Sequence, residues 1–363
     1  MMTSRFLIGL AASFLLLFSG CKEPDGASGG TSGAALYAYD SATSAVFVWT
    51  DLSTLYDSTT TSVAPTKQIT STVFTSKLSS LAWGGLCMDR QRGNLYLVSD
   101  TGNIVRVNNV RTQSGAISST VDVISFALST TGRLPSSTFG QASLDAQTDT
   151  LYITETSSSD MQIWVVANAS SQFQDASITL QSLKMSGDSG GTGVAAASGS
   201  VYAFMADGST VGTVVTYSGP RLRKGTSSGF TDANTIIGSS TLIGKYGSLA
   251  LDTGNGNLFV ARHNADAVAS TAPIQVFATG LFGQAYNQAP TATLGSATDQ
   301  PDLRVIAHAG TKDWLVGLKG TGSTAYGLIY VWKSPTGGTA AKTITASPIT
   351  SLFKGLAVDG NAS

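Results

Sequence analysis

The sequence predicts an all-β fold, built as a closed ring of six small antiparallel sheets. Three observations support this prediction. A two-strand unit recurs along the chain at a nearly constant spacing, and one more copy of it is divided between the two ends. No stretch after residue 20 shows the sustained 3.6-residue apolar period of an amphipathic helix, so we expect few helices.

The repeating unit is an apolar strand that ends in Asp, a polar turn, and a second strand of apolar and aromatic residues. The second strands start at Leu95, Leu151, Val201, Leu258 and Trp314, which places successive copies 56, 50, 57 and 56 residues apart. A regular period of this length is typical of repeat architectures in which each copy forms one structural unit. We therefore expect one four-stranded antiparallel sheet for each copy.

The divided copy predicts how the ring closes. Residues 355–359 form a first strand with no second strand after it, whereas residues 35–40 and 45–49 are predicted second and third strands without a first. Pairing them in one sheet leaves no open edge at the centre of the ring. The prediction is a six-bladed β-propeller closed by pairing of its N- and C-terminal strands in one blade. A seven-bladed ring with one unrecognised blade is the alternative, and a β-helix or a sandwich would not need the divided repeat.

The first twenty residues predict export. A short basic segment ends at Arg5, residues 6–18 are apolar, and Ser19 and Gly20 precede Cys21. This is the layout of a secretory signal peptide, and the apolar segment is too short to span a bilayer. With Cys at the cleavage point, the segment resembles a bacterial lipoprotein signal, although Phe18 stands where that family prefers Leu. The resemblance implies that Cys21 carries lipid; an ordinary signal peptide is the alternative.

Three regions follow from these patterns. We expect a lipoprotein signal peptide over residues 1–20, a flexible tether over residues 21–34 and a β-propeller domain over residues 35–363. The tether is predicted from its Gly, Ser and Ala content. Lys22 rather than Asp follows the cysteine, which favours retention in the outer membrane of the cell envelope, facing the periplasm or the cell surface. The expected partners are the membrane, through the lipid on Cys21, and an envelope protein or glycan.

Composition excludes some classes of protein. The formal net charge is −1 and only 12% of the residues are charged, so no basic field exists to hold nucleic acid. Cys87 is the only cysteine besides Cys21, so we expect no internal disulfide and a fold stabilised by burial. Because Cys87 lies between Leu86 and Met88 in an inner strand, we expect a small buried residue rather than a nucleophile.

The order of an apolar strand ending in Asp, a Gly/Asn turn and a Leu-Tyr-Val strand resembles the NHL and YVTN-type β-propeller repeats. The resemblance covers nearly all of residues 35–363. It implies the fold, with the strand that ends in Asp innermost in each blade. It implies little about function, because propellers include hydrolases, dehydrogenases, lyases and binding scaffolds.

In this geometry the inner strands end at Asp89, Asp145, Asp252, His308 and Asp359. We expect each of these acids to accept hydrogen bonds from backbone N–H groups of the turn that follows it. A metal role for them is the alternative.

Ligand-binding residues are expected at the opposite mouth of the central channel, where turns lead from second to third strands. The candidates are Asp40, Asp100, Glu155, Asp207, Arg262, His263 and Lys319. The residues that lead into the inner strands would add aromatic surface there or fill the space between blades; they are Trp83, Phe139, Tyr246 and Phe353. Ordinary solvated turns are the alternative for the polar set.

The sequence favours a binding protein over an enzyme. His occurs only at His263 and His308, Glu occurs only at Glu23 and Glu155, and no Gly-x-Ser-x-Gly or His-Glu-x-x-His motif is present. A lactonase of the gluconolactonase type would use a Glu near the first blade, and none stands there. A quinoprotein dehydrogenase would need a His base beside basic residues, which His263 and its neighbours match only in part.

We therefore expect no cofactor, weak or absent metal binding, and a non-catalytic role in binding or as a scaffold. The ligand would be a protein, a glycan or a small polar molecule at the channel mouth. One alternative is a metal-assisted hydrolase or lactonase that uses Asp100 and Glu155. Another is a structural role at the cell surface, which the Ser- and Thr-rich outer strands would permit.

Overall fold

The computed structural model describes most of the chain from Gly33 to Asn361. The described residues are 33–60, 62–118, 120–157, 160–179, 181–185, 188–189, 193–205, 207–208, 221–237, 247–262, 273–295, 303–310, 312–319, 328–337, 342–346 and 353–361. They belong to one compact unit, Ser32–Ser363, which we call the propeller body. The predicted signal peptide, Cys21 and most of the predicted tether lie outside the described residues.

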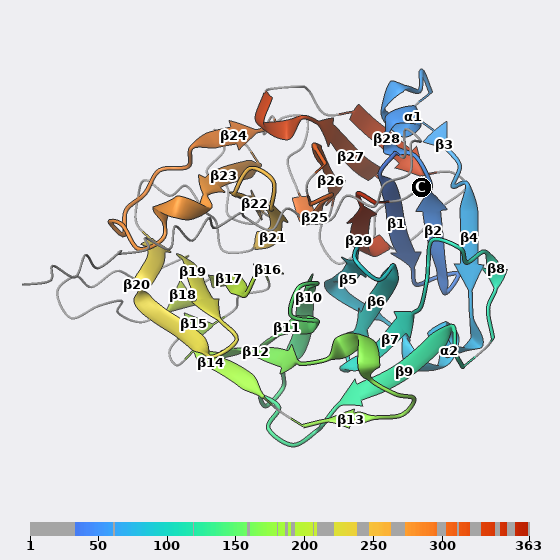
Figure 1. The fold of residues 1–363 in the computed structure, drawn as a ribbon, viewed down its shortest axis with the longest axis horizontal. Coiled ribbons are helices and arrows are strands. Elements are labelled where there is room, and N and C mark those ends of the chain that lie inside the picture. Colours follow the sequence, from blue (N-terminus) through green and yellow to red (C-terminus); the bar gives the residue numbers. More distant parts are fainter. Residues whose placement is uncertain are drawn as a thin grey trace, which may run out of the picture. The chain divides into compact units, whose positions relative to one another are not determined.

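The propeller body consists of six main sheets arranged as the blades of a ring (Figure 1). Each blade has four antiparallel strands that follow one another from the centre of the ring to its rim. Blade 1 contains β29 (Phe353–Asp359), β1 (Ala35–Asp40), β2 (Ala45–Trp49) and β4 (Lys67–Thr70). Blade 2 contains β5 (Leu81–Asp89), β6 (Asn94–Ser99), β7 (Asn103–Val107) and β9 (Val123–Leu128). Blade 3 contains β10 (Thr138–Asp145), β11 (Thr150–Thr156), β12 (Met161–Val166) and β14 (Ser182–Met185).

The second half of the ring repeats this order. Blade 4 contains β16 (Val194–Ala197), β17 (Ser200–Met205), β19 (Arg221–Thr226) and β20 (Gly229–Ile237). Blade 5 contains β21 (Gly247–Asp252), β22 (Asn257–Arg262), β23 (Ile274–Ala278) and β24 (Ala292–Leu294). Blade 6 contains β25 (Leu303–His308), β26 (Trp314–Lys319), β27 (Leu328–Lys333) and β28 (Lys342–Ala346). The structure thus has the predicted all-β, six-bladed propeller fold.

The innermost strands form an unbroken circle. Each contacts the next in the order β5, β10, β16, β21, β25 and β29, and β29 contacts β5. Blade 1 joins the two ends of the described chain, because β29 pairs antiparallel with β1, with Leu36 opposite Val358 and Ala38 opposite Leu356. The other edge of β1 pairs with β2. This is the pairing that the divided repeat predicts.

Three blades carry a fifth, two-residue strand that the sequence analysis did not predict. The strands are β3 (Ser62–Val63), β8 (Gly115–Ala116) and β13 (Ser177–Ile178), and they pair parallel with β28, β4 and β9. In each case the short strand comes from the following blade of the ring. It gives hydrogen-bond partners to an outer edge, the position where an open sheet would otherwise pair with another chain. A separate ribbon is formed by β15 (Asp188–Ser189) and β18 (Asp207–Gly208).

The helices of the described residues are short. α1 (Leu52–Asp57) begins after Asp51, whose carboxylate accepts a hydrogen bond from the backbone N–H of Ser53 at 2.9 Å. α2 (Thr72–Lys77) begins after Ser71 in the same way. Single 3-10 turns are η1 (Ala169–Ser171), η3 (Thr279–Leu281) and η4 (Pro335–Gly337). Among the described helices, none has the length and apolar character needed to cross a membrane.

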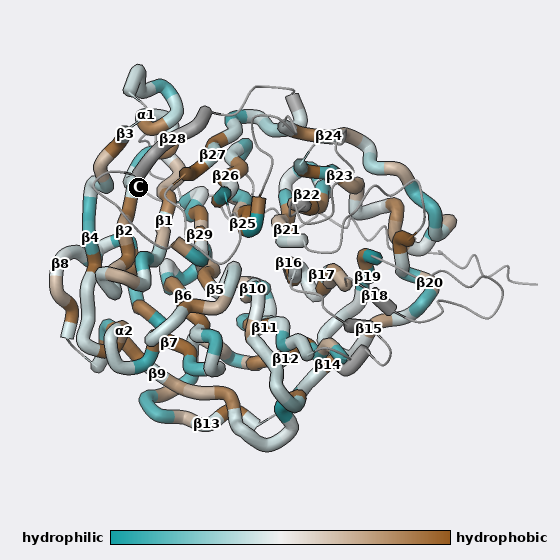
Figure 2. Tube along the Cα trace, turned by 180° about the vertical axis from the view of Figure 1, so that it is seen from behind, coloured by the Kyte–Doolittle hydropathy of each residue, from teal (hydrophilic) through white to brown (hydrophobic). Residues whose placement is uncertain are grey.

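The hydrophobic core lies between the blades. Six clusters of buried side chains occupy the six interfaces between neighbouring blades. The cluster between blades 6 and 1, for example, combines Leu36 and Phe47 with Val316 and Ile329. Hydrophobic residues accordingly follow the strands of the blades (Figure 2). Cys87 lies in the cluster between blades 2 and 3, and burial raises the pKa of its thiol, so it is a packing residue.

Candidate functional site

The residues that end the inner strands hold the turns that follow them. Asp89 Oδ1 accepts hydrogen bonds from the backbone N–H groups of Gln91 at 3.1 Å and Arg92 at 3.0 Å. His308 takes the place of Asp in blade 6, and its Nδ1 accepts from the N–H of Gly310 at 3.1 Å. The predicted turn role is confirmed for Asp89 and for its equivalents Asp145, Asp252 and Asp359, and His308 has the same role in blade 6.

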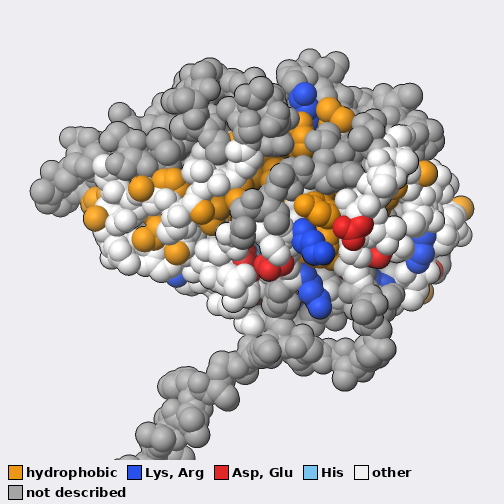
Figure 3. All heavy atoms as spheres, turned by 90° about the horizontal axis from the view of Figure 1, so that it is seen from above, with side chains coloured by type: hydrophobic (Ala, Val, Ile, Leu, Met, Phe, Trp, Pro, Cys, Tyr) orange, Lys and Arg blue, Asp and Glu red, His pale blue; other side chains and the backbone are white. Residues whose placement is uncertain are grey.

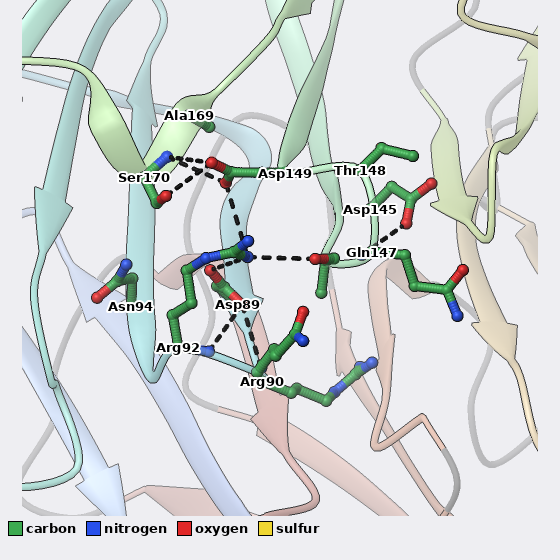
Figure 4. A network of polar contacts seen from close by, with 12 residues as sticks. Asp89, Arg90, Arg92, Asn94, Asp145, Gln147, Thr148, Asp149, Ala169 and Ser170 are labelled. Carbon is green, nitrogen blue, oxygen red and sulfur yellow. Dashed lines mark hydrogen bonds and ion pairs between the residues drawn. The ribbon is translucent and has the colours of Figure 1, made fainter. Parts of the chain in front are cut away.

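Ion pairs on the same face connect neighbouring blades (Figure 4). Arg92 Nη1 of blade 2 lies 3.3 Å from Asp89 Oδ2 and 3.8 Å from Asp149 Oδ1 of blade 3, and it donates to the carbonyl of Ala146. Asp149 also accepts from the hydroxyl of Ser170 at 2.6 Å. The charges in this network pair with one another, so the network connects blade 2 to blade 3.

Among the residues that end the inner strands, His308 has a pKa that folding lowers strongly. Its side chain is 2% exposed, and its ring stacks on that of Phe259 with centroids 5.3 Å apart. Burial is the main cause that lowers the pKa of His308 to about 4; Asp252 opposes this shift, and the positive charge of Arg90 adds to it. Within the described structure, Nε2 is buried without a hydrogen-bond partner. The imidazole is therefore neutral at pH 7.

Acid should destabilise the propeller through His308. Its folded-state pKa lies below the ordinary value of 6.5, so the unfolded chain takes up the proton first and stability falls as the pH drops from about 6.5 to about 4. At 1.36 kcal/mol per pKa unit, the full loss is about 3 kcal/mol. The variant His308→Asn keeps an oxygen acceptor for the N–H of Gly310 but does not titrate, so it should lose less stability over this range. Urea unfolding of both proteins at pH 7 and pH 4.5 tests this; parallel losses would contradict it.

At the opposite end of the inner strands, three blades bring an aromatic ring and two cations together. The guanidinium carbon of Arg304, in blade 6, lies 4.4 Å from the centre of the Trp83 ring, in blade 2. The Nζ atom of Lys354, in blade 1, lies 5.9 Å from the same centre and donates a hydrogen bond to the hydroxyl of Ser80. All three side chains are half-buried. We call Trp83, Arg304 and Lys354 the mouth cluster.

Gln141 of blade 3 crosses the centre of the ring next to the mouth cluster. Its Oε1 accepts from the backbone N–H groups of Val194 in blade 4 at 3.2 Å and Leu249 in blade 5 at 2.9 Å, and its Nε2 donates to the carbonyl of Leu249 at 2.6 Å. Gly84, which follows Trp83, has φ +75°, and a Cβ atom there would lie 3.1 Å from the Cβ of Gln141. The Gln141 side chain thus connects blades 3, 4 and 5 beside the mouth cluster.

Two of the predicted ligand-binding residues lie near the mouth cluster. The backbone N–H of Asp100 donates to the carbonyl of Ser80, the residue that Lys354 contacts, at 3.0 Å. Lys319 pairs across the sheet with Leu303, the neighbour of Arg304. The side chains of Asp100 and Lys319 are half-buried. They extend the mouth cluster toward blades 2 and 6.

Asp40 lies in the interior instead. It ends β1, is 1% exposed, and accepts hydrogen bonds from the backbone N–H of Ala42 at 3.1 Å and the hydroxyl of Thr43 at 2.6 Å. Its carboxylate thus supports the turn to the third strand of blade 1, as the inner-strand acids do at the other face. A ligand in solution does not reach it in this structure.

Glu155 is also in the interior, with 0% of its surface exposed. Its carboxylate accepts hydrogen bonds from the hydroxyl of Ser137, the backbone N–H of Leu134 at 3.3 Å, the amide of Gln162, and the indole N–H of Trp164 at 2.7 Å. These donors come from the segment before β10 and from β12. The carboxylate therefore connects blade 3 to the loop that enters it, and its oxygen atoms are occupied by the protein.

The remaining predicted residues fall outside what the structure describes. Arg262 ends β22 and pairs with Gly247, but its side chain is outside the described residues. The same holds for His263, for Tyr246 and for the side chain of Asp207. Their roles in ligand binding stay predictions.

The aromatic residues at the starts of the inner strands divide into two kinds. Phe139 and Phe353 are 5% and 0% exposed. Phe353 packs edge-on against Phe47 at a centroid distance of 6.3 Å. These two fill the space between blades, whereas Trp83 is half-buried and keeps part of its ring at the surface.

Two further features bear on other kinds of site. Within the described residues, no three His, Cys, Asp or Glu side chains lie close enough together to hold a metal ion. A hollow of about 200 Å³ lies at the rim of blade 2, beside α2 and β9. It is lined by Lys77 and Asp175, which form an ion pair at 3.7 Å with 42% and 69% of their side chains exposed. Exposed pairs of this kind are weak, and their charges already compensate each other.

Comparison with solved structures found chains that are similar to this one. A chain from the crystal structure of a nidogen/laminin complex matches with a TM-score of 0.53 and 12% identity, over 90% of this chain and 98% of that one. A gluconolactonase from Xanthomonas campestris matches with a TM-score of 0.44 and 12% identity, over 74% of this chain and 77% of that one. The match to the nidogen/laminin complex shows a shared fold, and at 12% identity it shows the fold alone. No protein-family model and no curated protein matches the chain, so the NHL and YVTN resemblance rests on the repeat pattern.

Arg304, Lys354 and Gln141 are not among the site residues predicted from the sequence. Arg304 and Lys354 are the second residues of their inner strands, and Trp83 is the third residue of its own. The residues at the starts of the inner strands come together at one mouth. Comparing these positions across the repeats could therefore have identified Arg304 and Lys354 from the sequence. Among the residues at these positions, only the aromatic ones were predicted to contribute to the mouth.

Proposed function

We propose that this chain is a non-catalytic binding propeller whose ligand site is the mouth cluster. One observation carries the proposal: Trp83, Arg304 and Lys354 come from three different blades and converge at one end of the inner strands, where two cations lie beside a half-buried tryptophan. Ligand sites combine an apolar or aromatic surface with a few polar groups that fix orientation. Gln141, which connects blades 3, 4 and 5 through its amide group, lies beside this site.

The hydrolase alternative receives less support from the described residues. It requires Asp100 and Glu155 to act on one metal ion or one water molecule. The oxygen atoms of Glu155 already accept four hydrogen bonds from blade 3 and its loop. A metal site needs at least three ligand atoms close to one point.

Tryptophan fluorescence offers a direct test of the proposed site. Trp83 is half-buried, whereas Trp49, Trp164, Trp314 and Trp332 are at most 9% exposed, so iodide quenching reports mainly on the mouth. We expect at least one member of a panel of neutral, acidic and basic sugars and amino acids to protect Trp83 in the full chain purified in detergent. Trp83→Ala should then weaken binding of that compound, measured by calorimetry, at least tenfold.

A matched control is Lys312→Ala, which removes an exposed charge from blade 6 at the opposite face. It should leave binding unchanged. A ligand that binds equally well to the parent chain and to Trp83→Ala would place the site elsewhere, and a panel without any binder would remove the support for this proposal.

We also propose that the protein is held at the cell envelope by lipid on Cys21. The support is the sequence of residues 5–21 and the Gly- and Ser-rich segment after them. Cys21→Ser should release the protein from the membrane fraction or block its processing. Identical fractionation and electrophoretic mobility of parent and variant would contradict the proposal. Ala27→Ser, a change of similar size in the tether, serves as the control.

A further inference from the structure

Among the described side chains that are part-exposed at this mouth, cations outnumber acids, because Asp40 and Glu155 at the same end are buried. Arg304, Lys354 and Lys319 face one acidic residue of the predicted set, Asp100, in this part of the propeller. The chain as a whole has a formal net charge of −1 and few charged residues. Most of the described surface seen in Figure 3 is uncharged. Three cations on neighbouring strands are therefore a local feature and not a reflection of composition.

These cations lack acidic partners within the described structure. The ion pairs found there involve Lys77, Arg92, Arg111 and Arg223, but not Arg304, Lys319 or Lys354. The contact of Arg304 is the Trp83 ring, and those of Lys354 are the same ring and the Ser80 hydroxyl. All three side chains are half-buried, so they have lost part of their hydration, and no described residue supplies an opposite charge to them. A bound anion would supply that charge.

The geometry of Arg304 suits an oxyanion in particular. A guanidinium group that lies over an aromatic ring keeps its N–H groups in its own plane, where they can donate two parallel hydrogen bonds to a carboxylate. Contact with Trp83 restricts the orientation of this fork before a ligand arrives. Lys354 adds a second positive charge, fixed by its hydrogen bond to Ser80.

Trp83 suits a ring-shaped ligand. An aromatic side chain offers a large flat surface at low conformational cost, and sugar rings present an apolar face of C–H groups to such a surface. A ligand that joins a saccharide ring to an oxyanion would use the indole and both cations at once. A flat aromatic acid or a free inorganic anion would use only part of the cluster.

We infer that the mouth cluster binds an acidic saccharide, with the oxyanion held by Arg304 and Lys354 and the sugar ring against Trp83. This inference rests on the proposed function and narrows it to one chemical class. The oxyanion can be the carboxylate of a uronic acid or the phosphate of a sugar phosphate. Both the carboxylate and the phosphate offer negatively charged oxygen atoms to the guanidinium of Arg304. The titration below distinguishes one from the other.

The test is calorimetric titration of the full chain in detergent with glucuronate, glucose 6-phosphate and glucose. At least one of the two acidic sugars should bind ten or more times tighter than glucose, and the stronger one identifies the oxyanion. Raising the salt concentration should weaken acidic-sugar binding and leave glucose binding unaffected. Arg304→Gln should reduce the preference for the acidic sugar at least tenfold, whereas Lys312→Gln, at the opposite face, should not change it.

Failure of this inference differs from failure of the proposed function. Equal binding of glucose and both acidic sugars, abolished by Trp83→Ala, would overturn the acidic class and keep the mouth as a binding site. Binding of a basic or amino-acid compound alone would do the same. Unchanged preference in Arg304→Gln would place the oxyanion elsewhere and also overturn the inference. A circular dichroism spectrum and unfolding midpoint equal to those of the parent will show that Arg304→Gln is folded.

Discussion

Deleting residues 353–363 should prevent the propeller body from folding stably. The deletion removes β29, so β1 loses its inner partner and the contact between blades 6 and 2 through β29 disappears. Phe353, Leu356 and Val358 are at most 1% exposed, and burial of such side chains is worth about 2 kcal/mol each. The ion pair between Arg111 and Asp359, at 2.6 Å, is lost as well. The total is comparable with the whole stability of many proteins, about 5–15 kcal/mol.

Thermal unfolding followed by circular dichroism measures the effect. The truncated chain should be insoluble, or should melt tens of degrees below the parent. Leu356→Ala is a graded version that should cost about 3 kcal/mol through the cavity it creates. Asn361→Ala, an exposed change just after the strand, should leave the midpoint within error. An unchanged midpoint for the truncation would show that the ring does not need β29.

Replacing Glu155 by Ala should destabilise the protein by about 3–5 kcal/mol, because buried donors would lose a charged acceptor. Four donors converge on this carboxylate, and its exposure is 0%. Glu155→Gln keeps one oxygen acceptor but places an NH2 group among donors, so it should fall between Ala and the parent. Urea unfolding at pH 7 gives the difference in stability.

The matched control for Glu155 is Asp100→Ala, because Asp100 is the equivalent acid of blade 2 and is half-buried at the mouth. Its loss should change stability by about 0.5 kcal/mol or less. If Glu155→Ala were as stable as the parent but lost ligand binding, Glu155 would be a ligand residue rather than a structural one. Comparing Glu155→Ala with Asp100→Ala therefore distinguishes a role in stability from a role in ligand binding.

The repeat pattern in the sequence was sufficient to predict the fold. The predicted second strands that start at Leu95, Leu151 and Leu258 lie in β6, β11 and β22, and the Asp residues that end the inner strands bond to their turns. These features depend on neighbours in the sequence, which a pattern records. The strands β3, β8 and β13 have two residues each and pair with a different blade, so no local pattern predicts them.

The site was harder to predict because it depends on where each strand stops. Counting from the start of the second strand gives both Asp100 and Glu155. β6 ends at Ser99, which leaves Asp100 in the turn, whereas β11 continues to Thr156 and keeps Glu155 inside the sheet. The donors that stabilise Glu155 come from another strand and from a loop. The convergence of Arg304 and Lys354 on Trp83 likewise exists only once blades 6, 1 and 2 are adjacent.

The position of β1 has a mechanical consequence. The described chain enters the propeller at Gly33 and continues directly into β1, which lies between β29 and β2. A pull on the preceding segment therefore acts on a strand that is hydrogen-bonded along both edges. Extracting it means breaking two ladders together, whereas a strand at a sheet edge would peel away from a single neighbour. A propeller attached in this way can bear tension at its N-terminal end without losing its first strand.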